Sequence, residues 1–219
     1  MDPPHVDLPT PDLTCSLEVP AGCDLFVAKV DLSNYYHTLR LPDWLHPYFA
    51  LPPVPASLVG LGELYGASTL LYPCCATLPM GWSHSVFLGQ TVHEFVLDRQ
   101  SLLAQPDRVT RTNDFLVDRA RHQVYIDDLI LYGLDADELL ALQHAYVVAM
   151  RARGFVVAAD KIVPPSVAGV SVLGYVVDGR SHEVGVSVSS LQRLASATLS
   201  VVDSRYASGE AVARLVGRW

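Results

Sequence analysis

The chain contains little positive charge. Its 219 residues include 15 lysines and arginines against 23 aspartates and glutamates, which gives a net charge of −8. Only two of the positive residues are lysines, Lys29 and Lys161. A protein that grips a polyanion such as nucleic acid usually presents an excess of basic residues. The composition therefore argues against strong nucleic-acid binding by this chain alone.

Cysteine pairs, long apolar runs and a leader sequence are also missing. The four cysteines show no Cys-x-x-Cys spacing, which argues against a zinc knuckle and against a disulfide framework. Although 50% of the residues are hydrophobic, no stretch of about 18 consecutive apolar residues occurs, so no membrane span is expected. The first residues lack a basic segment followed by an apolar one, which predicts an intracellular protein, either cytoplasmic or nuclear.

The most informative feature that is present is a pair of adjacent acids in strand-like sequence. Asp127 and Asp128 follow Tyr125 and Ile126, and apolar residues flank them on both sides. The pattern predicts two short strands that meet at a tight turn with the acids at its tip. Two carboxylates about 4 Å apart repel by roughly 1 to 4 kcal/mol, so a fold that places them together usually recruits cations. The alternative is an ordinary turn, because Asp forms local hydrogen bonds that favour turns.

A third acid lies almost a hundred residues earlier. Residues 26–32 form a short, mostly apolar run that predicts a buried strand and delivers Asp31 at its end. Three carboxylates from two strands could then converge. Mg²⁺ prefers oxygen ligands, holds few carboxylates and completes its shell with water and substrate phosphates. The three acids therefore predict a magnesium site suited to phosphoryl transfer.

Five short motifs follow one another along the chain. They are Asp-Leu-Ser-Asn-Tyr-Tyr-His at 31–37, Leu-Pro-Met-Gly-Trp-Ser-His-Ser at 78–85, Tyr-Ile-Asp-Asp at 125–128, Gly154-Phe155 with Lys161, and Leu-Gly-Tyr at 173–175. In this order they resemble the palm motifs of reverse transcriptases, particularly those of retrotransposons. The resemblance covers roughly residues 6 to 217.

The resemblance implies an α+β fold, the palm of a right-hand polymerase, in which helices back an antiparallel sheet. The expected divisions are an extended N-terminal arm or fingers remnant at 1–24, a palm at 25–188 with partial fingers at 41–79, and the start of a thumb at 189–219. Only 30 residues precede Asp31. Most of the fingers are therefore expected to be missing, and the chain is expected to be a piece of a polyprotein without its ribonuclease H domain.

The implied activity is that of an RNA-directed DNA polymerase, which adds deoxynucleotides to a primer 3′-hydroxyl. Asp31 and Asp127 would bridge two Mg²⁺ ions, which Mn²⁺ could replace. Asp128 would assist from beside them, and Leu32 would offer its backbone carbonyl as a further metal ligand. Lys161 would be the general acid for the departing pyrophosphate, whereas without the motif it is interpreted as a surface lysine.

The resemblance assigns further residues to the nucleotide and the primer. The backbone amides of Asn34 and Tyr35 would meet the triphosphate. Tyr36 would be a steric gate against a 2′-hydroxyl, although alone it is interpreted as a core tyrosine. Gly81 would allow close approach to the base pair because it has no Cβ. Met80 departs from the polar residue of some relatives and offers only weak hydrogen bonding. Ile126 would face the incoming sugar, and the primer grip would comprise Leu173, Gly174 and Tyr175.

The expected partners are an RNA or DNA template-primer, deoxynucleoside triphosphates and other polyprotein domains, namely fingers, ribonuclease H, and integrase or recombinase. Two other classes fit part of the pattern. A non-catalytic remnant or nucleic-acid-binding piece fits the short fingers and the acidic charge, but it gives no reason for intact Asp31, Asp127 and Asp128. A metal-binding regulatory domain of nucleotide-cyclase type also uses carboxylates and Mg²⁺, but it leaves the Leu-Pro-Met-Gly-Trp motif unexplained.

Hydrophobic periodicity and breaker residues predict the other elements. Helices are expected at residues 83–103, 135–153, 189–201 and 209–216. Asp135 or Asp137 would cap the second helix and Gly154 would end it. Strands are expected at residues 155–157, 170–177 and 183–188, and loops with short strands at 41–79.

Residues 105–122 carry four arginines and are interpreted as an insertion ahead of the acidic hairpin. A solvated surface loop is favoured there over a segment that touches nucleic acid. The histidines at positions 37, 84, 93 and 122 show no metal-binding spacing and are predicted to be structural.

Overall fold

A computed structural model of the chain describes residues 4–100, 103–112, 115–204 and 206–216. Its α-helices are α1 (Pro11–Cys15), α2 (Tyr35–Thr38), α3 (Gly62–Tyr65), α4 (Ser85–Gln100), α5 (Ala136–Arg151), α6 (Val188–Ser204) and α7 (Gly209–Val216). Its strands are β1 (Phe26–Asp31), β2 (Val54–Pro55), β3 (Leu70–Leu71), β4 (Arg121–Tyr125), β5 (Asp128–Gly133), β6 (Ile162–Ser166), β7 (Val170–Val172), β8 (Tyr175–Asp178) and β9 (Glu183–Val186). The 3-10 helices are η1 (Asp43–Phe49), η2 (Ala56–Val59), η3 (Gln105–Asp107) and η4 (Ala159–Lys161).

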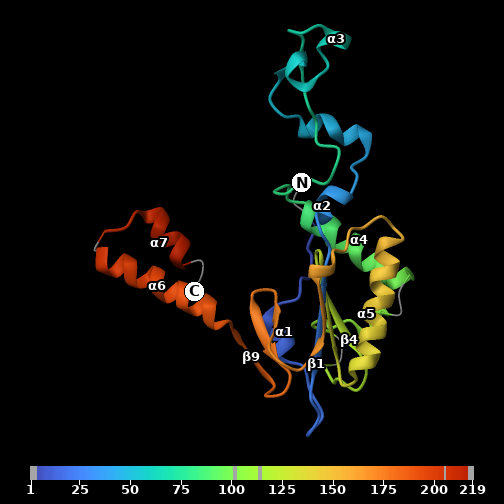
Figure 1. Cartoon of the computed structure of the whole chain (residues 1–219), viewed down its shortest axis with the longest axis vertical. Coiled ribbons are helices and arrows are strands. Elements are labelled where there is room, and N and C mark those ends of the chain that lie inside the picture. The colour runs from blue at the N-terminus through green and yellow to red at the C-terminus, as the bar shows by residue number, and fades with distance from the viewer. Residues whose placement is uncertain (1–3, 101–102, 113–114, 205, 217–219) are drawn as a thin grey trace.

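Three regions are visible in Figure 1. A body of sheets and helices fills the lower part, a slender segment with α3 near its tip rises above it, and α6 and α7 lie to one side. The rising segment comprises residues 41–79 and is called the projection below. The four-stranded sheet with α4 and α5 is called the palm. The antiparallel sheet backed by helices confirms the predicted α+β class, whereas the division into arm, palm, fingers and thumb stays a prediction.

The palm sheet has the strand order β4-β5-β1-β6, and each neighbouring pair is antiparallel. The strands predicted at residues 26–32 and on either side of the acid pair are confirmed as β1, β4 and β5. No strand is predicted at β6, which contains Pro164 and Pro165. The structure places β6 at the sheet edge, where the missing N–H groups of two prolines are tolerated.

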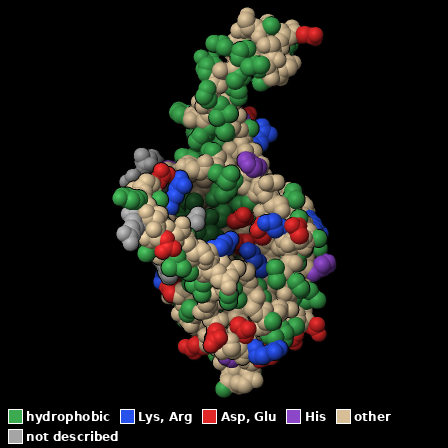
Figure 2. Space-filling model, turned by 60° about the vertical axis from the view of Figure 1, so that its left-hand side comes forward, with side chains coloured by type: hydrophobic (Ala, Val, Ile, Leu, Met, Phe, Trp, Pro, Cys, Tyr) green, Lys and Arg blue, Asp and Glu red, His purple; other side chains and the backbone are tan. Residues whose placement is uncertain are grey.

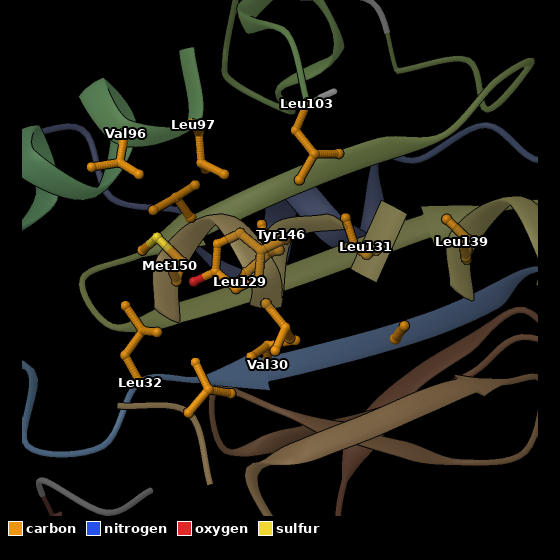
Figure 3. Close-up of a cluster of buried hydrophobic side chains, with 14 of the residues drawn as sticks. Val30, Leu32, Val96, Leu97, Leu103, Leu129, Leu131, Leu139, Tyr146 and Met150 are labelled. Atoms are coloured by element: carbon orange, nitrogen blue, oxygen red, sulfur yellow. The ribbon is translucent and has the colours of Figure 1, made fainter. Parts of the chain in front are cut away.

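Helices α4 and α5 cover one face of this sheet. Figure 3 shows Tyr146 and Met150 of α5 over Leu129 and Leu131 of β5, with Val30 of β1 beside them. All five side chains are fully buried. Each contributes roughly 1.5–3 kcal/mol by leaving water. The two helices therefore fix the sheet from behind.

The predicted cap of α5 is confirmed at one of its two candidate residues. The Asp135 carboxylate accepts hydrogen bonds from the backbone N–H groups of Asp137 and Glu138, at 2.8 and 3.1 Å. Asp135 is therefore the N-cap, and Asp137 lies in the first turn. At the other end Gly154 follows the helix with φ +85°, a conformation that glycine adopts without strain.

The opposite face of the palm sheet packs against the three-stranded sheet β7-β8-β9. Ile130 and Tyr132 of β5 share a buried cluster with Val172 and Tyr175. The Thr14 hydroxyl of α1 lies 3.2 Å from the Tyr132 hydroxyl and 2.8 Å from that of Tyr175. The N-terminal arm is thus anchored in the core by α1.

Two predicted strands are wrong. Val156 forms only an isolated bridge with Ser33, so residues 155–157 are not a strand. The run at 170–177 is broken by a two-residue turn at Leu173 and Gly174, with φ of +46° and +91°. Positive φ at both positions is the type I′ hairpin turn, whose usual signal is Asn-Gly or Gly-Gly. Because a leucine occupies the first position, the sequence does not indicate this turn.

The remaining helices follow their predictions closely. Helix α7 has the predicted bounds, α6 extends the predicted 189–201, and α4 is shorter than 83–103, of which residues 101 and 102 lie outside the described residues. The projection is built from short strands, loops and single helical turns, as predicted. Within the described ranges, no helix combines the length and apolarity needed to cross a membrane.

The interpretation of residues 105–122 as a solvated arginine-rich loop is wrong in part. Arg108 and Arg121 are buried. Each of the four arginines forms an ion pair with at least one acidic side chain of the protein. Arg108 pairs with Glu94 and Asp98, and Arg111 pairs with Asp7 and Asp12. Arg119 pairs with Asp107 and Asp118, and Arg121 pairs with Asp118. These charges stabilise the segment against the body, which leaves them less suited to meet phosphates.

Candidate active site

Antiparallel pairing places two of the predicted acids side by side. Asp31 at the end of β1 is the direct partner of Asp128 at the start of β5. Residues directly opposite one another in a sheet point to the same face. The Leu32 backbone N–H donates to the Asp127 carbonyl at 3.0 Å, which ties the hairpin turn to β1. The strand register thus gathers the acid row, a name used below for Asp31, Asp127 and Asp128.

The hairpin turn between β4 and β5 is strained. Tyr125 pairs with Asp128, so the loop consists of only Ile126 and Asp127. Ile126 has φ +53°, which is rare for a β-branched residue. Strain of this kind costs on the order of 1–3 kcal/mol and persists only where the surroundings enforce it.

Helix α4 holds this turn through two polar side chains. Gln90 accepts a hydrogen bond from the Ile126 N–H at 2.7 Å and donates to the Val124 carbonyl at 2.9 Å. His93 Nδ1 lies 2.7 Å from the Ile126 carbonyl, and its Nε2 lies 2.9 Å from the Tyr146 hydroxyl. Burial lowers the pKa of His93 to about 4, so the ring is neutral at pH 7, with Nδ1 donating to the carbonyl and Nε2 accepting from Tyr146.

The sequence motifs do not include Gln90, and His93 is predicted only to be structural. The signal for their role is weak: two polar residues three apart on a helix that otherwise contributes apolar side chains to the core. Gly89 is a third missed residue in the same helix. A Cβ there would lie 3.5 Å from Ile126 Cγ2 and from Tyr36 Cε1. These are ordinary van der Waals distances, so Gly89 lies against the turn and the tyrosine, but this packing does not itself require glycine.

Both lysines of the chain lie against the acid row. Lys161 Nζ is 2.8 Å from Asp31 Oδ2, and Lys29 Nζ is 3.1 Å from Asp128 Oδ1. Lys161 is thus at the site, as the motif implies, whereas Lys29 is not predicted. Asp128 Oδ1 is buried and, within the part of the chain that the structure describes, accepts no well-aligned hydrogen bond. Its contact with Lys29 is an ion pair.

The electrostatics confirm that the charged groups are close. Burial raises the pKa of Asp127, and the charge of Asp31 adds to this rise. Burial also raises the pKa of Asp128, whereas the positive charge of Lys29 lowers it. The hydrogen bond to Asp31 raises the pKa of Lys161, so its ammonium keeps its proton at neutral pH. Burial therefore disfavours the ionised forms of Asp127 and Asp128, and nearby positive charge favours them.

The donor set suits a hard cation, although the side chains do not form a closed cage. Among the described residues, no three His, Cys, Asp or Glu side chains are placed to hold a metal ion together. Lysines instead hold Asp31 and Asp128. The donors are carboxylates, which Mg²⁺ prefers, and the side chain of Asp31 is 24% exposed and therefore accessible to an ion. The residues thus fit Mg²⁺, and the metal site stays a prediction.

The tyrosine pair of the first motif lies next to the acid row. Tyr35 is buried, and its hydroxyl donates to the Gly89 carbonyl at 2.7 Å. Tyr36 is half-buried. Burial, and after it the charge of Asp127, raise the pKa of the Tyr36 hydroxyl. The structure therefore brings Tyr36, Ile126 and Asp127 together, with Tyr36 partly open to solvent.

The other residues that the resemblance assigns to nucleotide binding lie on loops. Asn34 precedes α2 in a left-handed conformation, with φ +54°. Met80 is exposed, and Gly81 has φ +95° with open space where a Cβ would stand. Glycine is thus required at position 81 by its backbone conformation, and the space beside it is free among the described residues.

The predicted primer grip is split between surface and core. Leu173 and Gly174 form the tip of the β7-β8 hairpin. The Tyr175 ring is buried, and its hydroxyl meets Thr14. Tyr175 therefore positions the hairpin from beneath, and only the tip is available for contact.

Solved structures share this fold. No protein-family model and no curated protein matches the sequence. The foamy viral protease-reverse transcriptase dRH in complex with ds DNA is 12% identical, with a TM-score of 0.64, over 100% of this chain and 30% of that chain. The foamy viral protease-reverse transcriptase is 13% identical in a complex with dsDNA (TM-score 0.61, 98% of this chain, 35% of that chain) and in one with an RNA/DNA hybrid (TM-score 0.63, 97% and 23%).

At this low identity the likeness establishes the fold alone. The chain has the mixed α/β fold of a reverse transcriptase polymerase domain, with antiparallel sheets and helices. It spans about a third or less of the chains that it matches.

Proposed function

We propose that this chain is an RNA-directed DNA polymerase that transfers deoxynucleotides to a primer 3′-hydroxyl. The observation that carries the proposal is the register that sets Asp31 opposite Asp128, with Asp127 at the adjoining turn. This arrangement occurs in a fold shared with reverse transcriptases. The five sequence motifs, which resemble those of retrotransposon reverse transcriptases, support a retrotransposon as its source, and other polyprotein domains are proposed as its partners.

The reaction forms a bond between the primer O3′ and the α-phosphorus of the nucleotide and breaks the bond to pyrophosphate. Asp31 and Asp127 would hold two Mg²⁺ ions, which would supply activation of the hydroxyl and charge stabilisation of the leaving group. The proton of the primer hydroxyl passes to solvent. Lys161 then donates its Nζ proton to the departing pyrophosphate oxygen. Its position supports this role, because the ammonium lies 2.8 Å from Asp31 Oδ2 on a side chain that is 43% exposed and mobile enough to turn toward a nucleotide.

The half-buried ring of Tyr36 supports selection of the sugar. It lies within electrostatic range of Asp127 and against Gly89, at the edge of the acid row. A bulky ring there leaves no room for a 2′-hydroxyl, which favours deoxynucleotides. The backbone amides of Asn34, which is left-handed, and of Tyr35 at the start of α2 are the groups assigned to the phosphate oxygens.

The binding of a template-primer duplex is part of the proposal. The similar foamy viral proteins were solved in complex with dsDNA and with an RNA/DNA hybrid, which supports the same class of ligand here. Figure 2 shows a hollowed face in which acidic and basic side chains gather below the projection. That face is the expected side for the primer end.

A second function, nucleic-acid binding without catalysis, is favoured by one observation. Both lysines already pair with acids of the row, so two of its three carboxylates have a counter-ion without metal. The two functions make opposite predictions for primer extension.

The test is primer extension by the purified chain on an RNA template with Mg²⁺ and deoxynucleotides. We expect extension, and we expect Asp127→Asn to reduce it by about a hundred- to a thousandfold, because a charge that stabilises the transition state is lost. Glu63→Gln is the matched control, since it makes the same acid-to-amide change in the projection. Extension that survives Asp127→Asn would refute the assigned site. Template-primer binding without any extension would favour the non-catalytic function.

A further inference from the structure

We propose that Lys29 is a built-in counter-ion of the acid row, whose ammonium neutralises Asp128 and leaves Asp31 and Asp127 to bind metal. This inference rests on the proposed polymerase function, because it assigns the charge balance of the same site. It starts from the observation that the chain has only two lysines and that each forms an ion pair with one acid of the row.

The position of Lys29 is fixed by the sheet. Lys29 lies two residues before Asp31 on β1 and therefore points to the same face. Its direct partner on β5 is Ile130, two residues beyond Asp128, so Lys29 and Asp128 are diagonal neighbours. Their side chains are only 19% and 14% exposed, and Nζ lies 3.1 Å from Oδ1. Little water can screen this pair, so the two charges are tightly coupled.

Lys161 is held much less firmly. It lies at the end of η4, beside the edge strand β6, and its side chain is 43% exposed. An exposed ion pair contributes little to stability, so the ammonium can leave Asp31 at small cost. If Lys29 left, the largely buried Asp128 carboxylate would lose the one cation that forms an ion pair with it among the described residues. Asp31 is therefore free to exchange its lysine for a metal ion, whereas Asp128 keeps its own.

This difference sets the charge that an incoming metal meets. Three carboxylates and one fixed ammonium leave two negative charges for the ions and the exchangeable lysine. Lys29 thus keeps the acids together in the absence of metal. It also weakens the attraction for a divalent cation, because like charges repel across the same short distance.

The direct test is calorimetric titration of the purified full chain with Mn²⁺, combined with melting temperatures measured with and without Mn²⁺. Lys29→Met removes the charge and retains an apolar stem of similar length. We expect Mn²⁺ to bind about tenfold more tightly, while the metal-free melting temperature falls and recovers at saturating Mn²⁺. Lys29→Arg should keep the wild-type affinity. Arg40→Met is the control for net charge, since it removes an exposed cation that pairs with Asp43 outside the row.

The double variant Lys29→Met/Asp128→Asn carries the test if the single variant fails to fold. It removes both charges of the pair and should bind Mn²⁺ with about wild-type affinity. A large loss of affinity in the double variant would make Asp128 a required ligand and overturn the inference. Unchanged or weaker binding by a folded Lys29→Met variant would overturn it as well.

Asp127→Asn distinguishes failure of this inference from failure of the proposed function. If Asp127→Asn leaves Mn²⁺ binding intact, the acid row is not the metal site and the proposed function fails. If Asp127→Asn abolishes binding while Lys29→Met leaves it unchanged, only the role of Lys29 fails.

Discussion

The palm and the projection use charge and burial in opposite ways. The palm gathers both lysines and the acid row at one end of a sheet and buries the side chains behind it. The projection contains no lysine or arginine. It exposes large hydrophobic side chains, among them Trp44, Tyr48, Leu58, Leu64 and Tyr72. In Figure 2 it rises above the hollowed face as a segment rich in hydrophobic side chains.

This contrast in charge and burial shows which region determines the geometry of the site. The contacts that hold the acid row come from β1, β5, α4 and η4, all in the body of the molecule. The projection joins that body at its base, where the Leu78 N–H donates to the Leu39 carbonyl, and the Leu41 N–H donates to the Ala76 carbonyl across the base itself. Substitutions in the palm should therefore disturb both fold and site, whereas substitutions in the projection should leave both intact.

A pair of truncations should produce the largest contrast in stability. Met150 is fully buried in the palm core, and Met150→Ala should lower the free energy of unfolding by about 2–5 kcal/mol through lost contacts and a cavity. Leu58 is 75% exposed, and Leu58→Ala should change it by about 0.5 kcal/mol or less. Urea unfolding measures both values. Equal losses would show that the projection is as firmly packed as the palm.

Low pH should destabilise the palm through protonation of His93. Burial lowers the pKa of His93 from 6.5 to about 4, so the fold favours the neutral ring. The resulting stability is complete above pH 6.5 and is lost as the pH falls through 4, which corresponds to roughly 3 kcal/mol. Asp127 and Asp128 act in the opposite direction, because their raised pKa values stabilise the fold at low pH and lose that effect as the pH rises.

The contribution of His93 is isolated by His93→Asn, which keeps a donor for the Ile126 carbonyl. Urea unfolding at pH 7 and pH 4 should show a smaller acid-induced loss in this variant than in the wild type. His46→Asn, in the projection, should retain the wild-type pH dependence. Identical pH dependence in all three proteins would remove His93 from the acid response.

The sequence was sufficient to predict the acid row because its members stand at the ends of short apolar strands. Register then follows from the requirement that apolar side chains face the core. Lys29 was not predicted at the site because its partner cannot be identified from the local sequence: Asp128 lies 99 residues later. The part that Gln90 and His93 play in holding the turn was missed for the same reason, since their hydrogen-bond partners there are backbone groups of a distant turn.

Backbone conformation accounts for the other errors. The Leu173-Gly174 turn requires positive φ at a leucine, and propensity does not indicate such a turn. Strand β6 contains two prolines and is acceptable only because it occupies a sheet edge, a fact of topology rather than of local sequence. Local patterns thus predicted the elements that pack on the core, and failed where a distant neighbour decides the conformation.

Sugar selection offers the smallest and most specific contrast between the two regions. Tyr36→Ala should raise ribonucleotide incorporation relative to deoxynucleotide by about tenfold, equivalent to ~1.4 kcal/mol, because the ring that excludes the 2′-hydroxyl is gone. Tyr72→Ala removes an exposed ring of the projection and should leave the preference unchanged. Primer extension with competing nucleotides measures the ratio. An unchanged ratio in Tyr36→Ala would remove the gate assignment while leaving the assignment of the acid row untouched, since the strand register that gathers the row does not involve Tyr36.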